Sequence, residues 1–171
     1  SYRTKTTPFD LIAIAALFRE DLSAIAVKQR VDIKSPKDLD GKRYASYKER
    51  YEDEIVRQMI RNDAGEGNFE IAYQEKLGIW DTIINGDCDA TWVFLNWEGV
   101  AAETYGLDLQ YFKMGDFEVP YSYFPVVVAS ERMLKDRSEL FRSFLLGTQQ
   151  RFLHAIDHPL ESTTILRESL P

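Results

Sequence analysis

The sequence predicts an α/β fold built on an open, mostly parallel sheet. Between residues 40 and 114, strand-like and helix-like segments alternate, which is typical of right-handed βαβ units. A continuous run of small apolar residues at 11–17 has the length and composition of a strand buried on both faces. No internal repeat or low-complexity tract interrupts the pattern.

Seven segments have the composition of strands. They lie at 11–17, 23–27, 43–47, 69–73, 89–94, 108–114 and 123–129. Helices or helical turns are expected at 35–39, 76–85, 96–105, 130–134, 138–156 and 160–169. A further helix is expected to follow the strand at 43–47 and to end at residue 62. Ser35, Asn96 and Ser130 are candidate N-caps, and Pro125 inside the last strand indicates an edge position or a bend.

Two of the expected helices carry apolar stripes. In the helix that ends near residue 62 the stripe is formed by Ile55, Val56, Met59 and Ile60. In the longest helix the residues expected to face inward are Leu140, Phe141, Phe144, Leu145 and Phe152. We therefore expect each of these helices to pack one face against another layer.

Composition argues against several classes of protein. The 171 residues carry 21 basic against 28 acidic side chains, and the net charge of −7 argues against a nucleic-acid surface. The single cysteine, Cys88, permits neither a disulfide nor a cysteine zinc site within one chain. No apolar run has the length of a membrane span. The chain starts with a polar run that leads directly into a buried strand, so its start resembles the middle of a protein, where an export signal would not be visible.

The stretch 39–62 is expected to position a binding site. Asp40 and Gly41 form a turn, a strand follows, and a loop of aromatic and charged residues leads into a helix. A strand that runs into a helix in this way presents free N–H groups and the positive end of the helix dipole above the sheet. Ligands of open α/β sheets usually bind at that edge.

Several segments resemble one family of two-lobed binding proteins. Residues 35–43 (SPKDLDGKR) resemble the entry into the second lobe of type II periplasmic binding proteins. Residues 83–90 (IINGDCDA) and 96–100 (NWEGV) follow in the family's order, and residues 141–145 (FRSFL) with 158–159 resemble its last helices. The resemblance is narrowest to the branch that serves ABC importers for sulfonates, taurine, nitrate and thiamine-precursor pyrimidines, which also contains the fungal pyrimidine-phosphate synthases.

This resemblance implies a three-layer αβα fold of the type II periplasmic-binding-protein class, with the second lobe complete and the first lobe partial. Residues 1–30 would be a remnant of the first lobe with a hinge strand, and residues 31–118 the second lobe. Residues 119–171 would form the return strand and the C-terminal helices that pack on the first lobe. An exposed first-lobe remnant would favour a homodimer.

By this resemblance, the loop at 47–51 would lie where the family binds its ligand. Sulfonate and nitrate binders commonly place Gly and Ser there, whereas this chain has Tyr47, Glu49, Arg50 and Tyr51. Aromatic rings stack on flat heterocycles, and a carboxylate accepts hydrogen bonds from an exocyclic amine or a ring N–H. The loop therefore favours a pyrimidine. The alternative is a solvated, charged connection between strand and helix.

Two further groups of residues are candidates for the same site. Trp92, Asn96 and Glu98 are expected to lie at the same sheet edge, where the last two can read donors and acceptors on a heterocycle. The alternative is a plain N-cap at Asn96 and a first-turn acid at Glu98. Tyr121 and Tyr123 lie near the expected hinge, where they either close over a ligand or pack half-buried.

The remaining residues with chemical potential have simpler interpretations. His154 and His158 are four residues apart but lack a third metal ligand, so we expect a surface role or a contact with the helix C-terminus. Cys88 is expected to be a structural thiol. The sequence contains no nucleophile elbow, P-loop or dinucleotide fingerprint. We therefore predict no metal, no cofactor and no catalytic residue.

The resemblance implies a solute-binding domain that delivers a small polar heterocycle to an ABC importer permease in the periplasm or elsewhere outside the cytoplasm. A thiamine-precursor pyrimidine is the favoured ligand. A binder of sulfonate, taurine or nitrate is one alternative. A cytoplasmic enzyme of thiamine pyrimidine biosynthesis is another, but those enzymes carry a cysteine-rich iron-binding segment and an early active-site histidine that this chain lacks. A ligand sensor or accessory domain is the third alternative.

Overall fold

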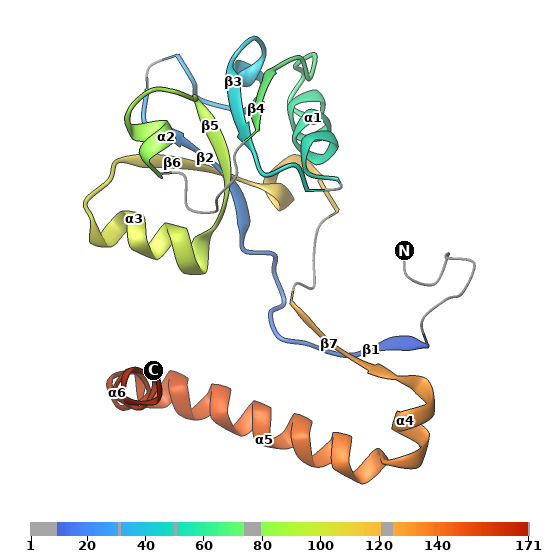
Figure 1. Cartoon of the computed structure of the whole chain (residues 1–171). Helices are drawn as coiled ribbons and strands as arrows, with labels where there is room; N and C mark the ends of the chain where they lie inside the picture. Colours follow the sequence, from blue (N-terminus) through green and yellow to red (C-terminus); the bar gives the residue numbers. More distant parts are fainter. Residues whose placement is uncertain (1–9, 31, 50, 74–79, 121–124, 171) are drawn as a thin grey trace. The chain divides into compact units, whose positions relative to one another are not determined.

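The computed structural model describes residues 10–30, 32–49, 51–73, 80–120 and 125–170. The chain divides into two compact units (Figure 1). One consists of Phe18–Phe124, and the other joins Ser1–Leu17 to Pro125–Pro171. Each unit has a sheet of its own.

The unit Phe18–Phe124 is built on a five-stranded sheet. Its strands are β2 (Ser23–Lys28), β3 (Arg43–Ser46), β4 (Glu70–Tyr73), β5 (Ala90–Phe94) and β6 (Leu109–Lys113), in the order β4-β3-β5-β2-β6. Strand β3 pairs in parallel with β4 and β5, and β2 runs antiparallel to β5 and β6. Four strands therefore share one direction, which confirms the expected mostly parallel sheet, and β2 is the exception.

Helices cover both faces of this sheet. Helix α1 (Glu52–Asn62) packs through Val56, Met59 and Ile60 against the face that includes Tyr44 of β3, and these four side chains are almost fully buried. The apolar stripe predicted for this helix is thus confirmed, with Ile55 partly buried beside it. Helix α2 (Trp80–Ile84) lies on the opposite face. The unit is a three-layer αβα sandwich, as the resemblance implied.

Short helical segments connect the remaining strands of this unit. They are the 3₁₀ turns η2 (Pro36–Leu39) and η4 (Met114–Phe117), the π-helical turn η3 (Leu95–Gly99) and helix α3 (Val100–Thr104). The turn predicted at 35–39 is confirmed, with Pro36 at its first position and the Asp38 carboxylate accepting the Ser35 N–H at 3.1 Å.

The other unit contains a two-stranded antiparallel sheet and three helices. These elements are β1 (Leu11–Ala16), β7 (Val126–Ser130), α4 (Glu131–Asp136), α5 (Ser138–Asp157) and α6 (Pro159–Ser169). The Ser130 hydroxyl caps α4 by accepting the Met133 N–H, as predicted. The expectation that β1 is buried on both faces was wrong, because its residues are only partly buried or exposed and it pairs with β7 alone among the described strands.

Helix α5 also differs from expectation. Of the residues predicted to face inward, Leu140 is 57% exposed and Phe144 is 54% exposed, and no residue of α5 is buried by the described part of the chain. The amphipathic pattern predicted a helix correctly. Within its own unit, the described segments leave these apolar residues uncovered.

Two expected placements differ from those observed, and part of a third lies outside the described residues. Strand β7 begins at Val126, after Pro125, rather than at residue 123, and residues 121–124 lie outside the described ranges. Residues 74–79 of the helix expected at 76–85 also lie outside them. Strand β2, which was placed with the first-lobe remnant at 1–30, lies inside the five-stranded sheet between β5 and β6. None of the described helices is long and apolar enough to cross a lipid bilayer.

Candidate functional site

The candidate site lies at the edge of the five-stranded sheet where β3 and β5 end. These two strands run in parallel and pair Ala45 with Thr91, so the loops that follow them leave the sheet at the same edge. The Thr91 hydroxyl also donates to the Ala45 carbonyl at 3.0 Å, which fixes this register. After β3 comes the turn at 47–49, and after β5 comes η3.

The turn at 47–49 is held by one buried carboxylate, that of Glu52 in the first turn of α1. Its Oε2 accepts hydrogen bonds from the N–H groups of Tyr47, at 3.0 Å, and Glu49, at 3.3 Å. Its Oε1 accepts the Tyr44 hydroxyl at 2.7 Å and the Tyr47 N–H at 3.2 Å. Glu52 is 5% exposed, so its carboxylate is buried and holds the turn through these hydrogen bonds, unlike a solvated acid in the first turn of a helix.

Burial changes the titration of both members of this pair. Loss of hydration raises the pKa of the Glu52 carboxyl, and its hydrogen bonds from Tyr44, Tyr47 and Glu49 act in the opposite direction. Burial and the neighbouring Glu52 charge raise the pKa of Tyr44 well above its ordinary value. The tyrosine therefore stays a hydroxyl donor at neutral pH.

A second carboxylate binds the end of β3. The Ser46 hydroxyl donates to Asp53 at 2.6 Å, and its oxygen accepts the Lys48 N–H at 3.0 Å. Lys48 has a φ of 62°, a left-handed conformation that only glycine adopts without cost, and its ammonium lies 5.0 Å from the centre of the Tyr73 ring. The turn is thus tightly determined by local contacts.

The loop after β5 is organised by Glu98 and not by Asn96. The Glu98 Oε2 accepts the N–H of Phe94 at 2.8 Å. Asn96 lies exposed inside η3, and the turn begins without a side-chain cap, so the prediction that Asn96 caps a helix was wrong. The chain forms a π-helical turn between β5 and α3, and the Glu98 side chain reaches back across this turn to the Phe94 N–H.

Exposed aromatic rings border the same edge. Tyr51, Tyr73 and Trp97 are 57%, 54% and 75% exposed. Trp92 differs from expectation, because its side chain is 7% exposed and lies in the hydrophobic core rather than at the sheet edge. Its carbonyl accepts the Tyr47 hydroxyl at 3.4 Å, so Trp92 links the two loops through its main chain.

The structure therefore brings five of the predicted residues to one sheet edge. These residues are Tyr47, Glu49, Tyr51, Asn96 and Glu98. Arg50, Tyr121 and Tyr123 lie outside the described residues. Sequence reasoning missed Glu52, since an acid in the first helical turn usually indicates only a favourable contact with the helix dipole.

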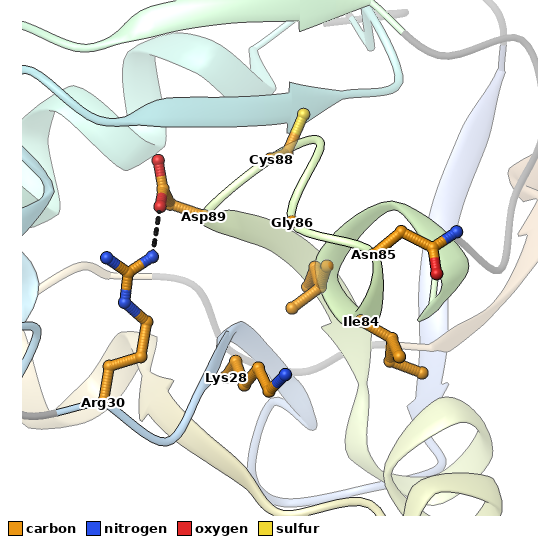
Figure 2. A pocket seen from close by; sticks show the side chains of 8 residues that line it. Lys28, Arg30, Ile84, Asn85, Gly86, Cys88 and Asp89 are labelled. Carbon is orange, nitrogen blue, oxygen red and sulfur yellow. Dashed lines mark hydrogen bonds and ion pairs between the residues drawn. The ribbon is translucent and has the colours of Figure 1, made fainter.

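A hollow of about 330 Å³ lies at the opposite edge of the sheet, where β5 and β6 begin (Figure 2). It is bordered by Lys28, Ile84 and Asn85 and by the ion pair between Arg30 and Asp89, whose atoms are 2.7 Å apart. None of the predicted ligand residues lines it. We therefore place the candidate site at the carboxyl edge, where the loop residues meet.

The single cysteine is buried in this unit, and the two histidines belong to the other unit. Cys88 is 4% exposed and packs on Ala45, and burial raises the pKa of its thiol, as expected of a structural thiol. The rings of His154 and His158 lie 4.7 Å apart in the other unit. Among the described residues, no three His, Cys, Asp or Glu side chains are grouped as metal ligands would be.

Comparison with known proteins defines first a class and then a family. The fold is that of type II periplasmic solute-binding proteins. The periplasmic aliphatic sulphonate-binding protein of Escherichia coli superposes with a TM-score of 0.76 at 16% identity, over 95% of this chain and 56% of the other. The alkanesulfonate-binding protein of Xanthomonas axonopodis pv. citri, bound to MOPS, gives 0.63 at 14% identity, with the same coverage of 95% and 56%.

The family follows from the sequence itself. A family model described as "NMT1/THI5 like" matches residues 1–162, and the chain belongs to this family. The formylaminopyrimidine-binding protein of Halalkalibacterium halodurans is 23% identical over 167 residues, which are 96% of this chain and 49% of that protein. The chain thus spans about half the length of the relatives it matches.

Proposed function

We propose that this chain is part of a solute-binding protein that holds a small, amine-bearing heterocycle, with a thiamine-precursor pyrimidine favoured, at the carboxyl edge of β3 and β5. The observation that carries the proposal is the similarity, over nearly the whole chain, to a protein named for binding a formylaminopyrimidine. The family match supports the same ligand class through its name.

The geometry of the edge is consistent with such a ligand. The side chains of Tyr51 and Trp97 are 57% and 75% exposed, and aromatic rings of this kind can stack on a flat heterocycle. Glu98 uses one carboxylate oxygen for the Phe94 N–H, and its other oxygen is available, as far as the described residues go, to accept an exocyclic amine. Stacking together with a few directed hydrogen bonds is the usual chemistry of small-molecule sites.

Delivery to an ABC importer outside the cytoplasm is part of this proposal. It is supported by the periplasmic and importer-linked proteins that share the fold. A sulfonate ligand is the second candidate, because sulfonate-binding proteins are among the solved structures that share the fold. Nothing in the described residues favours the enzyme alternative: Cys88 is buried, and both histidines belong to the other compact unit.

Self-association is also proposed. Helix α5 exposes apolar side chains such as Leu140, Phe144 and Ile156, and β1 and β7 pair only with each other in the described residues. A second copy of the chain would cover this surface.

Calorimetric titration tests the ligand. We expect saturable binding of a formylaminopyrimidine and none of ethanesulfonate or nitrate at the same concentrations. The variant Glu49→Ala should weaken pyrimidine binding, whereas Glu66→Ala, which removes an exposed carboxylate from the distant α1–β4 loop, should not. Binding of ethanesulfonate in preference to the pyrimidine would reject the proposal.

A further inference from the structure

Helix α1 begins where a bound anion would normally be stabilised, and this position already holds a negative charge. The first N–H groups of a helix lack intrahelical partners and attract anions, and N–H groups of the loop before the helix can add to such a site. Here the N–H groups of Tyr47 and Glu49 both point to one carboxylate oxygen of Glu52, at 3.0 and 3.3 Å. The Tyr44 hydroxyl donates to the other oxygen at 2.7 Å.

We propose that the Glu52 carboxylate permanently occupies the anion-binding position formed by the N–H groups of Tyr47 and Glu49, which we call the anion cradle. By occupying it, Glu52 makes the site select against sulfonates, phosphates and other anionic ligands. Its carboxylate takes the donors that an incoming anion would need and adds a like charge at the same point. Glu52 is then a specificity-determining residue for the heterocycle site. The inference rests on the proposed function for its biological meaning, but the occupied cradle is a property of the chain itself.

The contacts of Glu52 make it hard to displace. It is 5% exposed and accepts four hydrogen bonds from three residues, two of them in the turn that a ligand would approach. An anion could reach the two N–H groups only if this carboxylate moved away, which would leave the Tyr44 hydroxyl without its acceptor in the core. Rigid packing of this kind keeps the cradle closed to competing acceptors.

The other donors and charges near the turn act in the same direction. The Ser46 hydroxyl is taken by Asp53 at 2.6 Å, so a second carboxylate occupies the end of β3. Glu54 adds a third acid to the first turn of α1. The one described cation of the turn, Lys48, directs its ammonium to the ring of Tyr73, 5.0 Å from the ring centre. An arriving anion would therefore meet acidic groups rather than donors.

The test removes the Glu52 carboxylate from the anion cradle and measures whether an added anion then binds there. The variant Glu52→Ala is made together with Tyr44→Phe, so that no buried hydroxyl is left without an acceptor. Ethanesulfonate is then titrated while the amide NMR signals of Tyr47 and Glu49 are followed. We expect saturable shifts of these two amides in the double variant, with affinity about tenfold or more above that of the unchanged protein. The unchanged protein, Tyr44→Phe alone and the control Glu66→Gln, which removes a charge from the exposed α1–β4 loop, should show none.

Two results would overturn the inference. One is a folded double variant whose Tyr47 and Glu49 amides do not respond to ethanesulfonate. The other is an unchanged protein that binds ethanesulfonate through these amides. Should the double variant not fold, Glu52→Gln keeps the shape and removes the charge, and we expect it to bind ethanesulfonate about threefold or more tightly than the unchanged protein. No gain in that variant would also reject the inference. Because no pyrimidine is used, failure of this test is distinct from failure of the proposed function.

Discussion

The carboxylate of Glu98 accepts a hydrogen bond from the N–H of Phe94 at 2.8 Å, and this contact fixes an acceptor at the end of β5. The hydrogen bond spans the π-helical turn η3 and links its Glu98 to the last residue of β5. The carboxylate of Glu98 is therefore held in place before any ligand arrives, and such preorganisation favours directed hydrogen bonds.

Replacing Glu98 by alanine should lower the affinity for a formylaminopyrimidine by about tenfold or more, or ~1.4 kcal/mol, because an amine of the ligand loses a charged acceptor. Calorimetric titration measures this directly. The control is Glu103→Ala, which removes an exposed carboxylate from α3 without touching the sheet edge. Equal affinities of Glu98→Ala and the unchanged protein would exclude Glu98 from the site.

Two adjacent residues after the end of α1, Ala64 and Gly65, should change the free energy of unfolding in opposite directions when they are exchanged for glycine and alanine. Ala64 has a φ of 67°, and glycine adopts this conformation without strain. We expect Ala64→Gly to raise the free energy of unfolding by about 0.5 kcal/mol, the strain relieved being partly offset by a more flexible unfolded chain. Urea unfolding monitored by circular dichroism gives the value. A loss of stability would show that Ala64 makes a contact that outweighs its strain.

Gly65→Ala should have the opposite effect. A Cβ at this position would lie 2.6 Å from Cγ2 of Ile60 and 2.7 Å from Oδ2 of Asp40. Asp40 cannot easily move, because it accepts the N–H groups of Glu66 at 2.6 Å and Asn68 at 2.7 Å. We expect a loss of about 1–3 kcal/mol in the same unfolding experiment. An unchanged midpoint would mean that this loop shifts freely.

Local patterns predicted much of this fold and less of the site. The helical spacing of Val56, Met59 and Ile60 predicted both α1 and its buried face, because that spacing is a direct consequence of helix geometry. The sheet edge followed from the order of strands and helices. The direction of the Glu52 side chain could not be predicted from this order, since it depends on the Tyr44 hydroxyl and on the packing of the turn around it.

Asn96 and β1 show two further reasons for failure. Asn96 follows a strand, where an N-cap is the usual role, but the turn that forms is set by Glu98 reaching back to Phe94. Strand β1 has the composition of a buried strand, yet burial depends on which segments cover it, and composition carries no information about that. Both errors concern contacts with other residues: which side chain closes the turn at Asn96, and which segments cover β1.

The exposed apolar side chains of α5 predict self-association. We expect light scattering to show a mass that rises with protein concentration, and we expect Phe144→Asp to reduce this rise, because a charge placed on an apolar contact surface is costly to bury. The matched control is Gln150→Asp, which adds the same charge at an exposed polar position of α5. A mass that stays monomeric at all concentrations would contradict the proposed dimer.

The buried carboxylate of Glu52 predicts a dependence of stability on pH. Burial raises the pKa of this carboxyl above its ordinary value of 4.5, so the folded protein holds the proton at pH values where the unfolded chain has lost it. Linkage then requires the contribution of Glu52 to the free energy of unfolding to be largest below pH 4.5 and to fall as pH rises through the folded pKa.

The variant Glu52→Gln isolates this contribution, because glutamine keeps the size of the side chain and does not titrate. Urea unfolding of both proteins from about pH 4 to about pH 8 should show the stability difference, unchanged protein minus variant, decreasing as pH rises. The amide also donates where the carboxylate accepted, so the variant loses part of the Tyr47 and Glu49 contacts at every pH, and only the slope reports the titration. A difference that grows with pH would mean that the hydrogen bonds to the charged carboxylate outweigh its burial. In that case the Glu52 charge stabilises the turn more strongly than its lost hydration opposes it.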